Sequence, residues 1–445
     1  MHAPATASSA RSKGLRLVLL GSAMFSLFVF MPTSDNTGMI DFMAHYFPAR
    51  TLLHHGDPYN PDQVLREYLA QRGQKHEGSL MQGVATHYPY PPTLFFLTVP
   101  FAVLPFSLAK LLWGTLSVSS MIVASLLIWN LGTEYEPRVS GALIAFLLVN
   151  GETLAESGTV SALAIGFGSI GAWCFLKQRW EILGTVCLAA SLISKPQEFV
   201  LIWLCLLLSG RSHRKRACKT LVVAILLSLP SVVWVTHIVP NWPREIAGMI
   251  SGGTSTGSIL DPGPTSVSTP GSMLNFQVAA SLIYNDPHFY NPVTYLICGG
   301  LIVFWGFVTQ RPGAPKEIWI ALAAIAGLSL LIVYHRRYDS KLLLLALPAC
   351  TKLWAEGGKI GRVALAVTGS ALLFTGDGLW IFVSRLLQRL PPNHSGLLHF
   401  LQTVFVVLPA PLSLVALSGF YLWLYASRTA QRAAKVSDSP SVARA

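Results

Sequence analysis

The sequence predicts an all-α, polytopic integral membrane protein. Of its 445 residues, 52% are hydrophobic and only 12% are charged, and the mean hydropathy is +0.52. A soluble globular protein carries about twice that share of charged residues. The apolar residues are gathered into runs, and basic residues flank many of these runs, as they do at the cytoplasmic ends of membrane helices.

The formal net charge of +12 has two interpretations, nucleic acid binding and membrane topology. Its placement favours topology, because the densest basic run lies between two apolar segments and consists of Arg211, Arg214, Lys215, Arg216 and Lys219. Such a run is typical of a cytoplasmic loop. We therefore expect the lipid bilayer, and no nucleic acid, as the large partner.

The amino terminus is predicted to be cytoplasmic, with residues 1–14 disordered. Arg11, Lys13 and Arg16 precede the first apolar run, and no small-residue cleavage site follows it, which favours a retained span over a signal peptide. The membrane domain is expected to cover residues 15–427, and residues 428–445 to form a basic cytoplasmic tail. Because a crossing takes about 20 residues, 93–104 is predicted as a half-buried or re-entrant helix. We count about twelve spans, at 15–31, 107–131, 139–149, 159–176, 182–193, 199–209, 221–238, 292–308, 318–334, 342–354, 363–383 and 397–426.

Two outer loops interrupt this pattern, a first loop at 32–92 and a long loop at 239–291. The stretch 251–270 of the long loop is rich in Gly, Ser, Thr and Pro, which predicts a mobile lid or disorder rather than a packed domain. If the predicted spans cross the membrane alternately from a cytoplasmic amino terminus, then Asp41, Glu152, Lys195 and the run 335–339 lie on the extracytoplasmic face. A site could form there.

The first outer loop carries the most specific pattern in the chain. It consists of Asp41-Phe42, Tyr46, Ala49, Gly56 and Pro58-Tyr59, followed by Tyr88-Pro89-Tyr90-Pro91-Pro92. Together with Lys195-Pro196, these residues resemble glycosyltransferase family 87. Members of that family are membrane enzymes of the GT-C superfamily, typified by polyprenol-phosphate-mannose-dependent alpha-mannosyltransferases.

The resemblance implies a GT-C-type fold with a large first extracytoplasmic loop. It also implies a hexosyltransferase that moves a hexose or pentose, mannose first, from a polyprenyl-phosphate donor to a hydroxyl of a glycan or glycolipid acceptor. Asp41 would be the catalytic base, and direct displacement would invert the anomeric centre. We expect a plasma (inner) membrane protein of the cell envelope, with cytoplasmic termini and an extracytoplasmic site.

Other residues of the two loops have two interpretations each. Asp41 alone could be a helix cap, and Asp57 is expected to be a turn residue. Tyr88 and Tyr90 could anchor the protein at the bilayer surface or shape the substrate site, and Tyr46 belongs to the same pattern.

Cations on the outer face point to the phosphate of the donor. Lys195 could be an ordinary lysine snorkelling to the interface, but its outer position and the Lys-Pro resemblance favour contact with the leaving phosphate. His335, Arg336 and Arg337 form the densest polar cluster between two apolar runs, and phosphate would offset the cost of two arginines there. A solvated turn, with Asp339 paired to either arginine, is the structural alternative.

Glu152 and Glu156 are four residues apart and could share a helical face that binds substrate or a metal, although such pairs are commonly just solvated. No cofactor or metal is indicated. The six cysteines lie within or beside apolar segments, which predicts neither disulfides nor a zinc site. Gly158-Thr159-Val160-Ser161 stands where many relatives carry Gly-Gln-x-Asn, which leaves the sugar open.

A transporter or flippase of a lipid-linked sugar or small solute is the alternative function. About twelve spans would suit it. The chain shows no paired halves with matching broken helices, however, and its charged residues gather at one face rather than at mid-membrane.

Overall fold

The computed structural model describes residues 3–33, 39–72, 80–311, 317–389 and 395–437. Within them the chain is helical, and the only extended pairing is an isolated antiparallel bridge between Met273 and Arg336. The first part of the chain forms α1 (Ala3–Thr33), α2 (Ile40–Leu53), α3 (Pro61–Arg72), α4 (Leu80–Ala85), the 3-10 turn η2 (Pro92–Leu94), α5 (Phe95–Ala102), α6 (Phe106–Gly132), α7 (Pro137–Val149) and α8 (Glu152–Ser157).

The middle part forms α9 (Ser161–Leu176), α10 (Glu181–Ser194), α11 (Pro196–Leu208), α12 (Arg211–Ile238), α13 (Trp242–Thr254), α14 (Phe276–Ser281), α15 (Pro287–Thr309) and α16 (Ile318–Ile332). The last part forms the 3-10 helix η4 (Arg337–Ala346), α17 (Leu347–Glu356), α18 (Gly358–Thr375), α19 (Asp377–Gln388), α20 (Ser395–Gln402), the π-helical stretch η6 (Thr403–Val407) and α21 (Pro409–Ser437).

Five of the described helical segments are long and apolar enough to cross a membrane, namely Ser8–Phe30, Phe106–Gly132, Arg211–Ile238, Pro287–Thr309 and Gly396–Ala434. A sixth crossing results if α18 and α19, which meet at a bend of 53°, act together. These segments support a polytopic helical membrane protein. They account for about half of the roughly twelve spans that we counted from hydropathy, because the remaining apolar helices are short.

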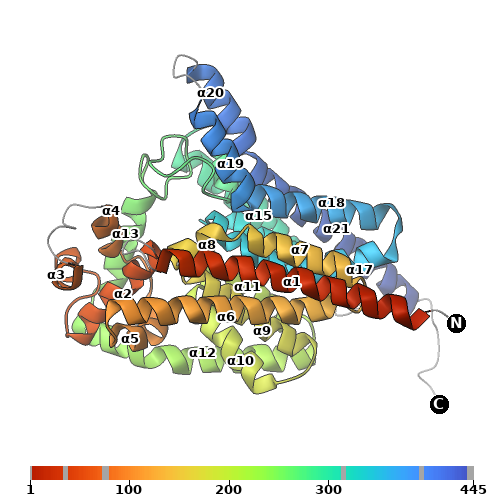
Figure 1. Ribbon diagram of the computed structural model, residues 1–445, viewed down its shortest axis with the longest axis horizontal. Helices are drawn as coiled ribbons and strands as arrows, with labels where there is room; N and C mark the ends of the chain where they lie inside the picture. Colours follow the sequence, from red (N-terminus) through yellow and green to blue (C-terminus); the bar gives the residue numbers. More distant parts are fainter. Residues whose placement is uncertain (1–2, 34–38, 73–79, 312–316, 390–394, 438–445) are drawn as a thin grey trace.

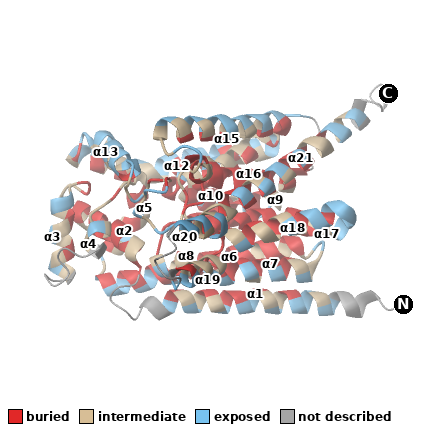
Figure 2. Ribbon diagram, turned by 90° about the horizontal axis from the view of Figure 1, so that it is seen from above, coloured by how far each residue is buried: buried red, intermediate tan, exposed pale blue. Residues whose placement is uncertain are grey.

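Two of the short apolar helices, α9 and α16, lie inside the bundle. At about 1.5 Å per residue the short apolar helices are shorter than the hydrocarbon core of a bilayer. Every residue of α9 and α16 is buried except Phe167, Leu176, Trp319 and Ile332, which are half-buried, and these helices pack against α10 and α21 respectively. Figure 2 shows this buried centre, with α1 and α15 at the edges of the molecule.

The long helices run side by side along the longest axis of the molecule (Figure 1). Both ends of the chain lie at one end of this axis, and α2, α3, α4 and α13 lie at the other. The first outer loop is therefore a helical cap on the bundle. The segment 93–104, expected as a half-buried helix, forms η2 and α5 beneath this cap and packs on α2.

Two terminal boundaries differ from our expectation. Residues 1–14 were predicted to be disordered, but α1 begins at Ala3. Alanine has the highest helix propensity, and extending a helix that already exists avoids the cost of nucleation. The tail predicted from residue 428 likewise continues α21 to Ser437, and Arg428 and Arg432 there form ion pairs with the buried carboxylate of Glu317.

The long outer loop is more ordered than its composition suggested. It contains α13 and α14, and the Gly-Ser-Pro stretch between them folds around the buried Asp261. The Asp261 carboxylate accepts hydrogen bonds from the backbone N–H groups of Gly257 (2.7 Å) and Gly263 (2.8 Å) and from the Thr265 hydroxyl (3.0 Å). A single buried carboxylate thus replaces the apolar core that this segment lacks.

Candidate functional site

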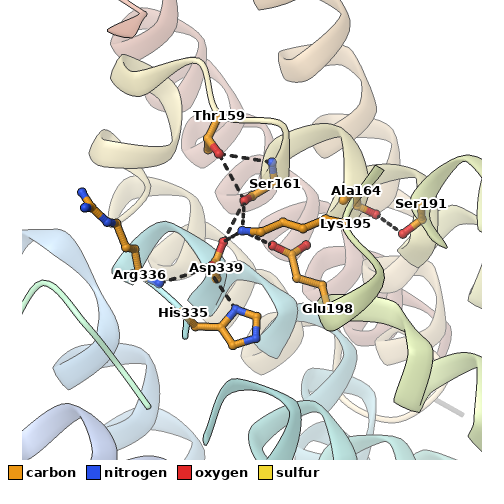
Figure 3. Close-up of polar contacts among 9 residues, drawn as sticks. All are labelled: Thr159, Ser161, Ala164, Ser191, Lys195, Glu198, His335, Arg336 and Asp339. Carbon is orange, nitrogen blue, oxygen red and sulfur yellow. Dashed lines mark hydrogen bonds and ion pairs between the residues drawn. The ribbon is translucent and has the colours of Figure 1, made fainter. Parts of the chain in front are cut away.

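A buried polar cluster surrounds Lys195 at the junction of α10 and α11. The ammonium donates to the Ser161 hydroxyl (2.6 Å), forms a short contact with Asp339 and lies 2.9 Å from a Glu198 carboxylate oxygen. Ser161 in turn donates to Asp339 (2.7 Å). Figure 3 shows these four side chains pointing toward one another from three separate helical regions.

Proline explains why Lys195 points into the bundle. Pro196 is the first residue of α11, and the residue before a proline is kept out of the helical region. Lys195 accordingly has φ −150° and ψ 77°, which ends α10 and starts α11 in a new direction. The Lys-Pro pair that we singled out in the sequence is therefore a helix break that delivers one cation to the interior.

A second break brings Asp339 to the same place. After α16 ends at Ile332 the chain is extended as far as Arg336 and then enters η4. The Asp339 carboxylate caps η4 by accepting the backbone N–H of Arg336 (3.0 Å), and the same oxygen lies 3.0 Å from Nδ1 of His335. Our alternative that Asp339 pairs with an arginine side chain is wrong for these contacts, because its ion-pair partner is Lys195.

Lys195 and Asp339 are held in their charged forms, whereas burial raises the pKa of the Glu198 carboxyl. Lys195 is 5% exposed and Asp339 is 1% exposed. Burial alone would lower the pKa of Lys195, but the facing Asp339 and Glu198 outweigh it and raise that pKa. Burial also favours protonation of Asp339, yet the Lys195 charge lowers the pKa of this carboxyl well below its usual range. Both groups therefore stay ionised at neutral pH, as a buried pair must to remain paired.

Asp41 lies in the first turn of α2 and is half-buried. Burial raises the pKa of its carboxyl, and the nearby charges of Arg336 and then Lys195 oppose that rise. The backbone before Asp41 is held by Met39, whose N–H donates to the carbonyl of Glu156 (2.9 Å). The site therefore joins one carboxylate from the first outer loop to two cations that follow it by more than 150 residues in the chain.

Arg336 is the cation that faces this carboxylate without joining the Lys195 cluster. Its Nε donates to the Tyr334 hydroxyl in a short contact, and its guanidinium interacts electrostatically with Asp41. In Figure 3 the Arg336 side chain extends away from Asp339, to which it is bonded through its backbone N–H and its backbone carbonyl. Arg336 is thus the better placed of the two predicted arginines for an anionic group.

Aromatic side chains form one wall of the site. The Tyr90 ring packs edge-on against His45, with 4.7 Å between ring centroids, and its hydroxyl interacts with both Lys195 and Asp41. Tyr88 packs behind it against Phe95. Burial, followed by the Lys195 charge, lowers the pKa of His45 to about 3, so this imidazole is neutral. On the other side the Tyr338 ring lies 5.2 Å from the Lys195 ammonium.

Three residues that we predicted for the site, Arg337, Tyr46 and Glu152, lie elsewhere and have other neighbours. Arg337 donates to four contacts with backbone carbonyls, those of Gly271, Phe374, Gly376 and Val406. The Tyr46 hydroxyl donates to the carbonyl of Leu104 (2.7 Å). Glu152 lies on α8 as expected, but its charged neighbours are Glu156, Asp377 and Arg385 rather than Asp41. Among these, only the backbone of Glu156 serves the site, through Met39.

One group of metal-ligand type exists among the described residues, formed by Glu198, His335 and Asp339 with ligand atoms within 4.8 Å of one another. The Lys195 ammonium lies between its two carboxylates. A lysine ammonium already supplies there the positive charge that a metal ion would supply, so the donor set suits the lysine and we assign no metal to it.

Sequence reasoning missed five residues of the site, namely His45, Ser161, Glu198, Tyr334 and Tyr338. Glu198 had a local signal, since it follows Lys195 at the i+3 spacing that brings two side chains together across a new helix start. Ser161 lies in the segment Gly158–Ser161, where the chain departs from the family pattern. The hydroxyl there binds Lys195 and Asp339.

Comparisons with protein-family models, with curated proteins and with solved structures give no match for this chain. The interpretation of its site therefore rests on the residues and contacts described above.

Proposed function

We propose that this protein is a membrane glycosyltransferase of GT-C architecture that transfers a hexose or pentose, mannose first, from a polyprenyl-phosphate donor to an acceptor hydroxyl. The observation that carries the proposal is the meeting of Asp41 with Arg336 and Lys195 behind a wall of tyrosines. A base near cations and beside aromatic side chains is what transfer from a sugar phosphate needs.

The roles follow from charge and accessibility. Asp41 is the general base, and a pKa raised by burial makes its carboxylate a stronger proton acceptor than an exposed aspartate. Arg336 holds the departing phosphate, because its guanidinium is not engaged by a carboxylate of the Lys195 cluster. Lys195 is a positioning residue and a second source of positive potential, since its direct partners are Asp339, Glu198 and Ser161. Arg337 has no part in this scheme.

The reaction balances as a single displacement. The acceptor oxygen forms a bond to the anomeric carbon while the bond from that carbon to the phosphate oxygen breaks. The hydroxyl proton passes to Asp41, and the electron pair of the broken bond leaves with the polyprenyl phosphate, whose charge Arg336 stabilises. Attack opposite the leaving group inverts the anomeric centre.

The proposal includes a topology. Lys195, Arg336 and Asp41 would lie at the extracytoplasmic face of a plasma membrane, and the basic start of α12 and both termini would lie in the cytoplasm. Figure 1 supports this polarity, because both chain ends lie opposite α2. The short apolar helices would then complete the roughly twelve crossings in pairs or as half-spans.

A transporter of lipid-linked sugars is the second candidate, and one observation favours it. Buried ion pairs such as Lys195 with Asp339 are frequent along transport pathways. In this protein the pair lies at helix breaks beside Asp41 and not within a long span, which fits an enzyme site better.

Transfer of radiolabelled mannose from polyprenyl phosphate by the purified protein tests the proposal. Asp41→Asn keeps the shape and removes the base, so turnover should fall by about 100-fold or more while donor binding persists. Asp57→Asn is the matched control, because Asp57 caps a turn by accepting the Tyr59 N–H (2.8 Å). Normal transfer by a folded Asp41→Asn protein would refute the assignment of the base, and transport without transfer would favour the second candidate.

A further inference from the structure

A cavity of about 90 Å³ lies outside the Asp41 site, between the long outer loop and the helices that follow α19. The loop contributes Ser266, Ser268 and Ser272, and the other side contributes His399, Gln402 and Thr403. Figure 1 shows this loop beside α19 and α20, on the side of the bundle away from α12. None of the residues given a role in the proposed reaction lines this cavity.

The lining has many hydroxyls and little charge. Of the residues that the structure describes, neither lysine nor arginine lines the cavity, and the carboxylate of Asp261 is occupied by hydrogen bonds within its own loop. The nearby Arg337 guanidinium is directed at backbone carbonyls, including that of Gly271. A cavity without a cation offers no preference for phosphate, whereas hydroxyl and amide side chains suit the hydroxyls of a neutral sugar.

One lining group has no partner. The hydroxyl oxygen of Ser272 is buried, and no described residue hydrogen-bonds to it. A buried polar atom without a partner costs stability, and rotation of the Ser272 side chain toward the cavity would let a bound hydroxyl supply that partner. Gln402 adds an amide that can both donate and accept.

The size of the cavity limits what it can hold. A space of 90 Å³ accommodates several water molecules, at about 10–15 Å³ for each, and is too small for a prenyl chain or a branched glycan. It suits a single sugar residue at the end of a longer chain that stays outside.

The cavity is tied directly to the catalytic segment. Ser272 lines the cavity, and its backbone carbonyl accepts the backbone N–H of Arg337 (3.1 Å). The adjacent Met273 forms the antiparallel bridge with Arg336. Leu274 then donates to the carbonyl of His335 (2.9 Å). The same short stretch therefore has the cavity on one side and the phosphate-facing arginine on the other.

We propose that this cavity is the acceptor subsite, and that it binds one neutral sugar residue of the acceptor glycan through hydroxyl and amide side chains. This deepens the proposed function by naming the acceptor as a neutral carbohydrate, and it rests on that function. Binding in the cavity also stabilises the stretch 271–274. Through the bridge between Met273 and Arg336, it stabilises the backbone of Arg336 as well.

A binding measurement tests the subsite without requiring transfer. The probe is a soluble mannose disaccharide, measured by saturation-transfer NMR on the full-length protein in detergent micelles, with its monophosphate as a comparison. Thr403→Trp fills the cavity and should weaken disaccharide binding by about tenfold or more. Thr256→Trp, on an exposed position of the same loop, is the matched control and should leave binding unchanged. The part of the binding that Thr403→Trp removes should be no tighter for the monophosphate than for the neutral disaccharide.

A milder variant keeps the test decisive if Thr403→Trp does not fold. Gln402→Ala removes one amide, and binding should weaken by roughly 2- to 10-fold, as for the loss of one hydrogen bond. In the transfer assay both variants should raise the KM for the acceptor and leave the KM for the donor unchanged.

The possible failures are distinguishable. Disaccharide binding that both variants leave intact, or a preference for the monophosphate that Thr403→Trp removes, overturns the subsite even if mannose transfer is confirmed. Binding that Thr403→Trp abolishes in a protein with no transferase activity upholds the sugar site and refutes the proposed reaction instead.

Discussion

Replacing Lys195 with methionine tests whether the polar cluster is as tightly paired as its contacts indicate. From the sequence Lys195 was expected to contact the leaving phosphate, but this side chain is 5% exposed and enclosed by Asp339, Glu198 and Ser161. Methionine preserves the length of the side chain and removes the charge. The buried charge of Asp339 then has no cation facing it, and its other neighbour is Glu198, whose pKa is raised by burial.

The magnitude follows from that uncompensated charge. Removing one partner of a buried ion pair typically costs about 3–5 kcal/mol. Adding Asp339→Asn removes the charge that Lys195→Met leaves without a partner. The free energy of unfolding of the double variant should therefore be about 2 kcal/mol higher than the sum of the two single changes predicts. Because Lys195→Met lowers stability this much, its loss of activity is interpretable only alongside a folding measurement.

Unfolding in mixed detergent micelles, titrated with sodium dodecyl sulfate and followed by circular dichroism, measures these differences. Lys215→Met is the control, since Lys215 is an exposed residue at the start of α12 and its loss should change stability by less than about 0.5 kcal/mol. If Lys195→Met unfolds at the same detergent fraction as Lys215→Met, the cluster does not stabilise the fold and our reasoning about its pairing is wrong.

Three further predictions concern pH, the outer loop and topology. Transfer should be lost as the pH falls through the pKa of Asp41, which burial raises above that of an ordinary aspartate. Because the Arg336 charge opposes that rise, Arg336→Gln should move the loss of transfer to higher pH. If the acid limb of the pH–rate profile does not move, Arg336 does not act on Asp41. Asp261→Ala removes the acceptor of three hydrogen bonds in the long outer loop and should make limited proteolysis there at least severalfold faster, whereas an unchanged cleavage rate would mean that the loop is ordered by other contacts. In a cysteine-free background, Asn60→Cys should react with a membrane-impermeant thiol reagent in intact cells and His213→Cys should not; equal labelling would contradict the topology.

Much of the site was visible in the sequence as separate pieces. Asp41 and Tyr90 were recognisable because they belong to a dense local pattern, and both face the same site. Glu198 was not recognised, although its spacing from Lys195 carries the information. His45 was missed because a histidine within a helix gives no local sign that both ring nitrogens will be buried without a described partner.

The sequence alone determined the membrane class, the long polar stretch after the first apolar run and the break at Lys195-Pro196, because hydropathy, helix propensity and the restriction before proline act between neighbouring residues. Only the tertiary structure decided which charge meets which. Lys195 and Asp339 are 144 positions apart, and no local pattern couples them. Arg336 and Arg337 are adjacent yet make different contacts, because Arg336 is the extended residue before η4 and Arg337 is the first residue of that helix. One therefore faces Asp41, and the other binds the backbone of the outer loop.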